Sequence, residues 1–294
     1  MSIKERIFLV GGNGFVGSHF QDIYSSKFIF KTYDKKDDIL NFVNLENSIK
    51  NFSPDYIINL ASFSTINSAK KYEAELYDLS IHGNRNIIKA LTNNKFKGTY
   101  LYVSSGEVYG YNTKKFFSEK DLLAPMNEYA VAKVMSETFL KFKNQSSNFR
   151  VLIARPFNHF GVNQSTNFFI PKLIQNIATQ INNKKVLIDI KNCKSKRSYL
   201  NVADVCAAYL FIIKNKNSDN FSVFNVCNQF AYTIPELINP LLIKKKINFE
   251  YINSNIDYPD NTLMGDNAKL KQLGWNMQVD LTDSLEKILD IFLQ

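Results

Sequence analysis

The sequence predicts an α/β fold, with a doubly wound parallel sheet and a smaller α/β lobe at the C-terminal end. From Ile7 to about Ile153, short apolar runs alternate with longer amphipathic stretches, a pattern typical of a parallel sheet covered by helices. A glycine-rich segment directly follows the first apolar run. Beyond Pro156 the rhythm changes, but no flexible linker divides the chain. We therefore expect a first domain over 1–156 and a lobe over 157–294, with the chain crossing back to the first sheet and a ligand cleft between the two parts.

The expected strands of the first domain are short, apolar and rich in β-branched or aromatic residues, as strands buried on both faces are. They are Ile7 to Val10, Phe28 to Tyr33, Tyr56 to Leu60, Thr99 to Val103 and Val151 to Ile153. Helices are expected between these strands, notably over Ser80 to Leu91 and Tyr129 to Lys143. The lobe is expected to contain helices over Ile170 to Ile181, Val202 to Ile213, Ile234 to Leu242 and Leu281 to Phe292, and strands over Val186 to Ile190 and Val223 to Val226.

Composition argues against several classes of protein. The chain of 294 residues is 45% hydrophobic, with 24 Phe and 15 Tyr, so it can bury a substantial core. Cys193, Cys206 and Cys227 lack metal-ligand spacing, so we expect neither a metal site nor a disulfide framework, which fits a reducing cytoplasm. No apolar run approaches the length of a membrane span. The lysines behind the net charge of +9 are scattered, which argues against a nucleic-acid partner. From the cysteines and the short apolar runs we expect a cytoplasmic protein that does not bind membranes.

The glycine-rich segment has the spacing of a dinucleotide-binding loop. Gly11, Gly14 and Gly17 recur every three residues between a predicted strand and a predicted helix. The first permits a sharp turn, the second lets the backbone approach a pyrophosphate, and the third lets the helix lie close to the strand. The helix N-terminus offers N–H groups and a partial positive charge to the phosphates. We therefore predict a Rossmann domain in which these glycines, with Phe15 and Val16, bind the cofactor.

A carboxylate at the end of the second predicted strand indicates which cofactor is bound. Asp34 stands where it would accept hydrogen bonds from the adenosine ribose hydroxyls, which favours NAD(H). NADP(H) stays possible, because Lys35 and Lys36 either neutralise a 2′-phosphate or are exposed turn lysines. Asp38, followed by Ile39, either reaches the adenine amino group or is a solvated loop acid.

Two further segments predict proton transfer beside that cofactor. Tyr129 and Lys133 are four residues apart and share one face of a helix. We expect the ammonium to lower the pKa of the phenol toward neutrality, so that Tyr129 gives or takes the alcohol proton during hydride transfer. Ser105 and Glu107 follow the fourth predicted strand, at the edge where doubly wound folds bind ligands. We expect Ser105 to hydrogen-bond the reacting oxygen, and Glu107 to act as an acid/base or a hydroxyl anchor.

In combination, these segments resemble the extended short-chain dehydrogenase/reductase family, which includes nucleotide-sugar epimerases, dehydratases and 4-reductases. The resemblance covers essentially the whole chain and rests on the glycine loop and on the segments 59–62, 104–110, 127–133 and 154–161. It implies that Ser105, Tyr129 and Lys133 form the catalytic set, with Tyr129 and Lys133 also contacting the cofactor. It further implies cofactor contacts from Leu60, Ala61, Ser62 and Pro156, the last of which lines the nicotinamide.

Within the family, the run from Arg155 to His159 most resembles the GDP-4-dehydro-6-deoxy-D-mannose reductase and GDP-mannose 4,6-dehydratase subgroup. The resemblance implies a GDP-sugar substrate held mainly by the C-terminal lobe, with Asn158 at the sugar and diphosphate. Arg197 matches an arginine that clamps the diphosphate, although a surface ion pair is the alternative. We expect His159 to be packed or hydrogen-bonded rather than a base. An arginine that often holds the nucleotide is replaced by the stretch at 256–257, which leaves the base open.

The residues expected to line the sugar are Ser105, Gly106 and Glu107, and they predict the reaction. Dehydratases that resemble this chain carry Thr-Asp-Glu or Thr-Ser-Glu there, in which the acid and the Glu eliminate water across C5 and C6, whereas this chain has Gly106 in the middle. We therefore predict an NAD(P)H-dependent reductase of a 4-keto nucleotide sugar, with Tyr129 as the acid. The alternatives are a 4-dehydrogenase, 4-epimerase or 4,6-dehydratase with tightly bound NAD, or a non-catalytic Rossmann ligand sensor.

The family resemblance also implies a homodimer formed by a four-helix bundle that includes the helix of Tyr129. The apolar residues of that helix either form this dimer interface or pack against the sheet of their own chain. They are Val131, Val134, Met135, Phe139 and Leu140.

Overall fold

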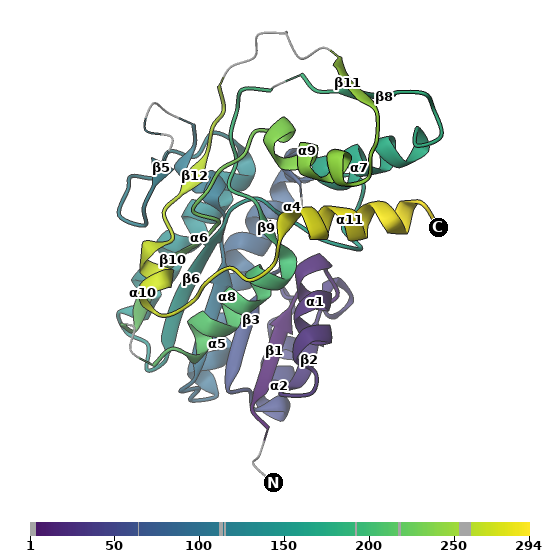
Figure 1. Cartoon of the computed structure of the whole chain (residues 1–294). Helices are drawn as coiled ribbons and strands as arrows, with labels where there is room; N and C mark the ends of the chain where they lie inside the picture. The colour runs from purple at the N-terminus through teal and green to yellow at the C-terminus, as the bar shows by residue number, and fades with distance from the viewer. Residues whose placement is uncertain are drawn as a thin grey trace.

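The computed structural model describes residues 4–63, 65–111, 114, 116–191, 193–216, 219–252 and 260–294. Its main layer is a six-stranded sheet in the order β10-β6-β4-β3-β1-β2, with helices on both faces (Figure 1). All neighbouring strands in this sheet are parallel. The strands are β1 (Arg6–Val10), β2 (Ile29–Tyr33), β3 (Tyr56–Asn59), β4 (Thr99–Val103), β6 (Arg150–Pro156) and β10 (Phe221–Val226). The predicted doubly wound parallel sheet is confirmed.

Alternation along the strands divides the core into two layers. In β1, Ile7 and Leu9 pack in the layer that contains helices α1 and α8, whereas Phe8 and Val10 pack in the layer that contains α2 and α5. Strands buried on both faces are apolar at every position for this reason. The helices concerned are α1 (Phe15–Tyr24), α2 (Phe42–Phe52), α5 (Asn84–Asn93) and α8 (Val202–Lys214), and α6 (Glu128–Asn144) packs against β6.

Strand β2 differs from its prediction, because it is not buried on both faces. It lies at the edge of the sheet and alternates between more and less exposed residues, with Ile29 45% exposed. An edge strand has one neighbour and less cover from helices, so apolar composition alone does not reveal its exposure. At the opposite edge, β10 pairs with β6, so the strand expected over Val223 to Val226 belongs to the main sheet. The segment 157–294 therefore contributes to both parts of the molecule.

The helix expected from Ser80 begins differently from the prediction. Residues Asp78–Gly83 form a π-helical segment, η2, before α5 starts at Asn84. The carbonyl of Ser80 accepts hydrogen bonds from the Asn84 side chain at 2.6 Å and from the Ser136 hydroxyl at 3.0 Å. The Ser80 carbonyl thus accepts hydrogen bonds from side chains instead of from a backbone N–H of an ordinary α-helical turn. This accommodates the wider π-helical turn. Two short helices, α3 (Ile66–Lys71) and α4 (Glu73–Tyr77), precede this segment.

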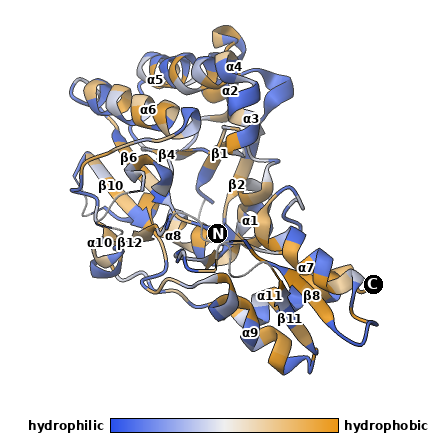
Figure 2. Cartoon of the chain, turned by 90° about the horizontal axis from the view of Figure 1, so that it is seen from above, coloured by the Kyte–Doolittle hydropathy of each residue, from blue (hydrophilic) through white to orange (hydrophobic). Residues whose placement is uncertain are grey.

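The C-terminal lobe has its own core, set apart from the helices that cover the main sheet (Figure 2). Helices α7 (Phe169–Thr179), α9 (Ile234–Lys244) and α11 (Leu281–Phe292) pack around a parallel pair, β8 (Val186–Asp189) and β11 (Phe249–Ile252). Two further parallel pairs connect loops near the main sheet. They are β5 (Phe116–Phe117) with β12 (Met264–Gly265), and β7 (His159–Phe160) with β9 (Leu200–Asn201). The described part of the chain contains no helix long and apolar enough to span a membrane.

Candidate active site

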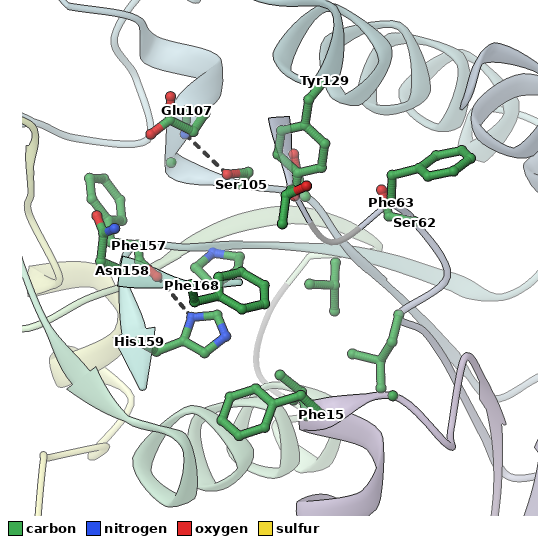
Figure 3. A pocket seen from close by; sticks show the side chains of 18 of the residues that line it. Phe15, Ser62, Phe63, Ser105, Glu107, Tyr129, Phe157, Asn158, His159 and Phe168 are labelled. Atoms are coloured by element: carbon green, nitrogen blue, oxygen red, sulfur yellow. Dashed lines mark hydrogen bonds between the residues drawn. The ribbon is translucent and has the colours of Figure 1, made fainter. Parts of the chain in front are cut away.

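A cleft of about 510 Å³ opens at the carboxyl ends of the main strands. Its walls come from the loops after β1, β3, β4 and β6, from α6 and from the start of α7. Ser105 and Tyr129 lie on one side of this space, and Phe15 and His159 lie on the other (Figure 3). Doubly wound folds bind their ligands at this edge of the sheet.

The glycine loop forms the floor of the cleft and fits a dinucleotide pyrophosphate. Gly11 has φ of +77°, a conformation that other residues rarely adopt, and its N–H donates to the carbonyl of Tyr33 at 2.8 Å. A Cβ on Gly17 would collide with the carbonyl oxygen of Gly12, so only glycine lets the helix approach the loop this closely. Gly14 caps α1 without a side chain, and Gly11, Gly14, Phe15, Val16 and Gly17 all line the cleft. The helix N-terminus is therefore open to an anion.

Asp34 carries a buried oxygen that fits a ribose hydroxyl. Its Oδ1 accepts the N–H of Asn13 at 3.2 Å, while its Oδ2 is buried without a hydrogen-bond partner among the described residues. A buried carboxylate oxygen without a donor is unfavourable, so a ligand hydroxyl would satisfy it. Lys35 and Lys36 are exposed on the short helix η1 (Lys35–Asp37) that follows.

Several of the predicted cofactor residues lie outside the wall of the cleft. Asp38 is exposed with φ of +56°, and its Oδ1 accepts the N–H of Leu40 at 2.9 Å. Ile39 is buried beneath Gly83. Ala61 is held by the Asn59 side chain at 3.0 Å and lies directly behind Gly11, where it supports the loop. The other predicted positions, Leu60, Ser62 and Pro156, line the cleft.

Ser105, Tyr129 and Lys133 converge at the centre of the cleft wall. The N-cap of α6 is Asn127, whose side chain accepts the N–H of Ala130 at 2.9 Å and fixes the first turn that carries Tyr129. Burial raises the pKa of Tyr129 to about 12, an effect that the hydrogen bond with the Ser105 hydroxyl opposes. Ser105 is 8% exposed and Lys133 is 3% exposed, so these polar groups are fixed by their surroundings.

The expected effect of Lys133 on the phenol is wrong in this structure. The Lys133 Nζ donates to the carbonyl of Val103 at 2.7 Å and lies 5.6 Å from the centroid of the Tyr129 ring. Burial lowers the pKa of Lys133 to about 7, and the nearby Glu137 carboxylate opposes that change. The pKa of Tyr129 therefore rises instead of falling, because desolvation acts on the phenol and the amine is turned toward the backbone. At neutral pH the phenol holds its proton and is ready to donate it.

Gly106 is closely covered by an aromatic ring. A Cβ at Gly106 would lie 3.0 Å from three atoms of the Phe157 ring, and Gly265 contacts the same ring from another direction. Phe157 is buried, and its ring is 6.1 Å from that of Tyr109. No side chain larger than hydrogen fits at position 106 unless Phe157 moves. The Phe157 ring thus lies directly against the backbone at Gly106.

Asn158 and His159 extend the cleft beyond Phe157. Asn158 is exposed and lines the cleft. His159 is packed and hydrogen-bonded, as expected: its Nδ1 is 3.0 Å from the carbonyl of Phe157 and its ring stacks on Phe15 at 6.2 Å. Burial lowers the pKa of His159, which keeps the ring neutral. The buried Oε1 of Gln164, also in the cleft wall, has no hydrogen-bond partner within the described segments.

Arg197 is half-buried and lies beside the cleft rather than in its wall. Its guanidinium donates to the carbonyls of Lys196 and Asn261 and lies 5.2 Å above the ring of Tyr111. Its backbone bridges to Tyr232 and Leu263. The stretch 256–257, where an arginine was expected from the family, lies outside the described residues.

Residues 7–227 match the NAD dependent epimerase/dehydratase family. The chain belongs to this family. The resemblance to extended short-chain dehydrogenases/reductases is confirmed, and the catalytic segments around Ser105 and Tyr129 both lie within the matched range.

Relatives in the family act on nucleotide sugars. The chain is 28% identical to the GDP-6-deoxy-D-mannose reductase of Pseudomonas aeruginosa, over 98% of this chain and 97% of that protein. It is 25% identical to the GDP-6-deoxy-D-talose 4-dehydrogenase of Aggregatibacter actinomycetemcomitans, over 80% and 79%. The solved structure of RMD from Pseudomonas aeruginosa complexed with NADPH matches with a TM-score of 0.88 at 28% identity, covering 99% of this chain and 98% of that one. The chain is thus an epimerase/dehydratase-family enzyme that modifies nucleotide sugars.

Some cleft residues of this family member carried no signal in the sequence. Phe63, Asn67 and Phe168 line the cleft from the loop after β3, from α3 and from the residue before α7. Tyr111, which lies behind Glu107 in the loop after Gly110, donates a hydrogen bond from its hydroxyl to the Glu107 carboxylate. Thr65 alone had a readable pattern, because Thr65 and Ser68 form a capping box at the start of α3.

A buried ion pair supports the catalytic helix from below. Arg155 in β6 donates to Glu137 in α6 through Nε at 3.0 Å and Nη2 at 2.6 Å, and the Ser104 hydroxyl donates to the same carboxylate. Arg155 also donates to the Tyr109 hydroxyl at 2.7 Å, which donates in turn to Asn225 Oδ1 at 2.8 Å. Both members of the pair are at most 5% exposed, so each charge is neutralised by its partner.

The apolar residues of α6 are divided between the chain's own core and solvent. Leu140 is buried in the layer beneath the main sheet, and Phe139 packs against the same layer. Val134 packs beside Phe157. Met135 is 42% exposed and Phe142, about two turns further along, is 63% exposed.

Proposed function

We propose that the chain reduces the C4 ketone of a GDP-activated 4-keto-6-deoxy sugar, using NAD(P)H and the proton of Tyr129. The observation that carries this proposal is the pairing of a protonated phenol beside Ser105 with an apolar ring over Gly106. A ketone reduction needs one proton donor, whereas the dehydratases that resemble this chain place another side chain in the position of Gly106. Here position 106 is a glycine covered by the Phe157 ring, so it has no side chain that could act as this second group.

The chain's own residues each have a step in this reaction. Bound NAD(P)H would supply the hydride. The Ser105 hydroxyl holds the C4 oxygen and Tyr129 donates its proton to that oxygen, which prevents charge from building up on it. Lys133 would contact the cofactor ribose by turning from the Val103 carbonyl, and its charge, when present, would favour the phenolate left on Tyr129. Glu107 lines the cleft beside Ser105, with its carboxylate turned toward Tyr111.

The preferences for nucleotide and cofactor rest on different observations. GDP is favoured because both relatives named above are enzymes of GDP-sugars. Asn158 in the cleft wall and Arg197 beside the cleft would bind the diphosphate, which is common to all nucleotide sugars. NADH is favoured by the unpartnered Oδ2 of Asp34, which suits two ribose hydroxyls better than a phosphate. NADPH is the alternative, since exposed Lys35 and Lys36 follow directly and the related RMD structure holds NADPH.

The test is a spectrophotometric assay with GDP-4-keto-6-deoxy-D-mannose and either NADH or NADPH, followed at 340 nm. We expect stoichiometric cofactor oxidation and a GDP-6-deoxyhexose product in the mass spectrum. Matched reactions with dTDP- and UDP-linked 4-keto sugars report the preference for the base. Absence of oxidation across all three nucleotides, together with stoichiometric NAD released on denaturation, would identify an epimerase or dehydratase instead.

A second candidate is the reverse oxidation, because one relative is named as a 4-dehydrogenase. The same groups serve this direction, with Tyr129 accepting the alcohol proton. GDP-6-deoxy-sugars incubated with NAD⁺ or NADP⁺ test it, and the direction with the larger kcat/KM at neutral pH decides between the two candidates. The high pKa of Tyr129 favours reduction, because a protonated phenol is a donor.

We also propose a homodimer with α6 in the interface. Met135 and Phe142 present exposed apolar surface on this helix, on the side away from Leu140. Light scattering coupled to gel filtration tests this, with Met135→Glu as the disrupting variant. A monomer at micromolar concentration for the unaltered chain would overturn the proposal.

A further inference from the structure

We propose that Tyr111 is a positioning residue that prevents Glu107 from acting as a base on carbon, and so confines the reaction to C4. The proposal rests on the reductase function proposed above and assigns specificity within it. Tyr111 stands one residue beyond Gly110, in the loop that follows η3 (Gly106–Tyr109).

The carboxylate of Glu107 is occupied by the phenol of Tyr111. The Tyr111 hydroxyl donates to both carboxylate oxygens, at 3.1 Å from Oε1 and 2.9 Å from Oε2. Glu107 lines the cleft, but its carboxylate points away from Tyr129 and from the centre of the space (Figure 3). The backbone N–H of Glu107 donates to Ser105 Oγ at 3.2 Å, so the main chain of Glu107 is fixed as well. The carboxylate therefore faces Tyr111, away from the reacting carbons.

Contacts on three sides hold Tyr111 in this position. The guanidinium of Arg197 lies 5.2 Å from the ring centroid, and the carbonyls of Lys196 and Asn261 hold that guanidinium in place. The backbone N–H of Tyr111 lies 3.3 Å from the sulfur of Met126. Burial and the Glu107 carboxylate together raise the pKa of Tyr111 to about 12, and Arg197 opposes them. The phenol stays protonated and remains a donor across the working pH range.

This contact has a chemical consequence for a 4-keto sugar. The hydrogen on C5 is adjacent to the ketone, so a base that removes this proton leaves the electron pair in an enolate on the C4 oxygen. When a solvent proton then adds to C5, the ketone is restored and C5 carries a hydrogen from solvent. If the proton adds to the opposite face, the configuration at C5 is also inverted. A carboxylate that accepts an O–H bond on both oxygens is a weaker base than a free one. Tyr111 thus protects C5 while the hydride is delivered to C4.

The experiment measures exchange at C5 in deuterium oxide. GDP-4-keto-6-deoxy-D-mannose is incubated with the full chain and no cofactor, and deuterium at C5 is read by NMR and mass spectrometry after borohydride trapping. We compare the unaltered chain, Tyr111→Phe, and the double variant Tyr111→Phe/Glu107→Gln. Tyr111→Phe keeps the ring beneath Arg197 and removes the hydroxyl alone. Tyr111→Met serves as a second variant of similar volume.

We expect C5 exchange by the unaltered chain to stay near the rate without enzyme, and to rise at least about tenfold in Tyr111→Phe. The double variant should return to the background rate, because the base is then absent. Equal exchange in the unaltered chain and in both Tyr111 variants would overturn the proposal, as would exchange that persists without Glu107. The reductase assay is independent of this readout, so a chain that shows the exchange pattern but oxidises no NAD(P)H would refute the proposed function and not the role of Tyr111.

Discussion

The two sides of the cleft are built in different ways. The cofactor side consists of short segments that directly follow β1, β3, β4 and β6, all of them strands of one sheet. The side expected to bind substrate is supported from behind by Tyr111, Arg197 and Asn261, which lie far apart in the chain and meet through the Arg197 side chain. The first arrangement fixes the positions of Ser105 and Pro156 through the sheet. The second can change from one relative to another without disturbing that sheet, which is how one fold serves different nucleotide sugars.

Burial separates the same two sides. Ser105 and Lys133 are almost fully buried, whereas Asn158 is exposed and Arg197 is half-buried. Substitutions on the cofactor side should therefore lower kcat, and those on the substrate side should raise KM. Each of the following changes tests that division.

The largest effect is expected from Tyr129→Phe. Removing the proton donor should lower kcat for reduction by about 10²- to 10⁴-fold. The ring and its packing are kept, so the melting temperature and the dissociation constant for the reduced cofactor should stay within error of the unaltered chain. Stopped-flow and cofactor-fluorescence titration measure these quantities. If kcat fell less than tenfold, another group would be the acid.

A smaller loss is expected from Arg197→Ala on the substrate side. A guanidinium–diphosphate contact that is lost should raise KM for the nucleotide sugar by about 10- to 100-fold while kcat changes little. Arg197→Lys is the matched control, since it keeps the charge and loses the planar fork. A fall in kcat with unchanged KM would show that Arg197 acts on the chemistry and would break the division between the two sides.

Asp34→Asn tests the choice of cofactor. The amide keeps the volume but weakens the acceptor, so the ratio of kcat/KM for NADH over NADPH should fall about tenfold. Lys36→Ala serves as the companion variant on the exposed turn. If it reduced kcat/KM for NADPH alone, the turn lysine would be a phosphate contact. An unchanged ratio in Asp34→Asn would remove the carboxylate from cofactor recognition.

The smallest effect concerns pH. The ammonium of Lys133 is populated below its pKa of about 7 and is lost above it, so kcat/KM for reduction should fall severalfold as pH rises from 6 to 8. Tyr129 stays protonated throughout this range because its pKa is about 12. Lys133→Met should be slower at pH 6 and show a flatter profile. A rise in kcat/KM over this range would mean that the neutral amine is the active form.

Elements with a clear apolar pattern were predictable from the sequence, whereas two-residue strands were not. β4 is expected and found over Thr99–Val103 because its apolar run is unbroken, and α11 over Leu281–Phe292 because its apolar residues repeat with the period of a helix. The pairs β5–β12 and β7–β9 are two residues long, which is too short for any period. Their pairing is decided by how the loops pack.

The same limit applies within the site. The spacing of Tyr129 and Lys133 correctly places both residues on the buried face of one helix. Spacing does not show in which direction the flexible Lys133 side chain points. In the structure its amine points toward the Val103 carbonyl, to which it donates a hydrogen bond. Tyr111 was missed for a related reason, since a tyrosine in a loop carries no pattern until the fold brings Glu107 and Arg197 to it.

The Glu137–Arg155 pair sets the register between α6 and the sheet. If α6 moved along its axis by one residue, the two hydrogen bonds between Arg155 and Glu137 would break in the protein interior. Breaking a buried ion pair lowers the free energy of unfolding by about 3–5 kcal/mol. Tyr129 lies two turns before Glu137 on the same helix, so its height above the sheet is fixed to that of Arg155. Tyr129 is therefore held at the edge of the sheet by a contact inside the core, independently of the loops at the mouth of the cleft.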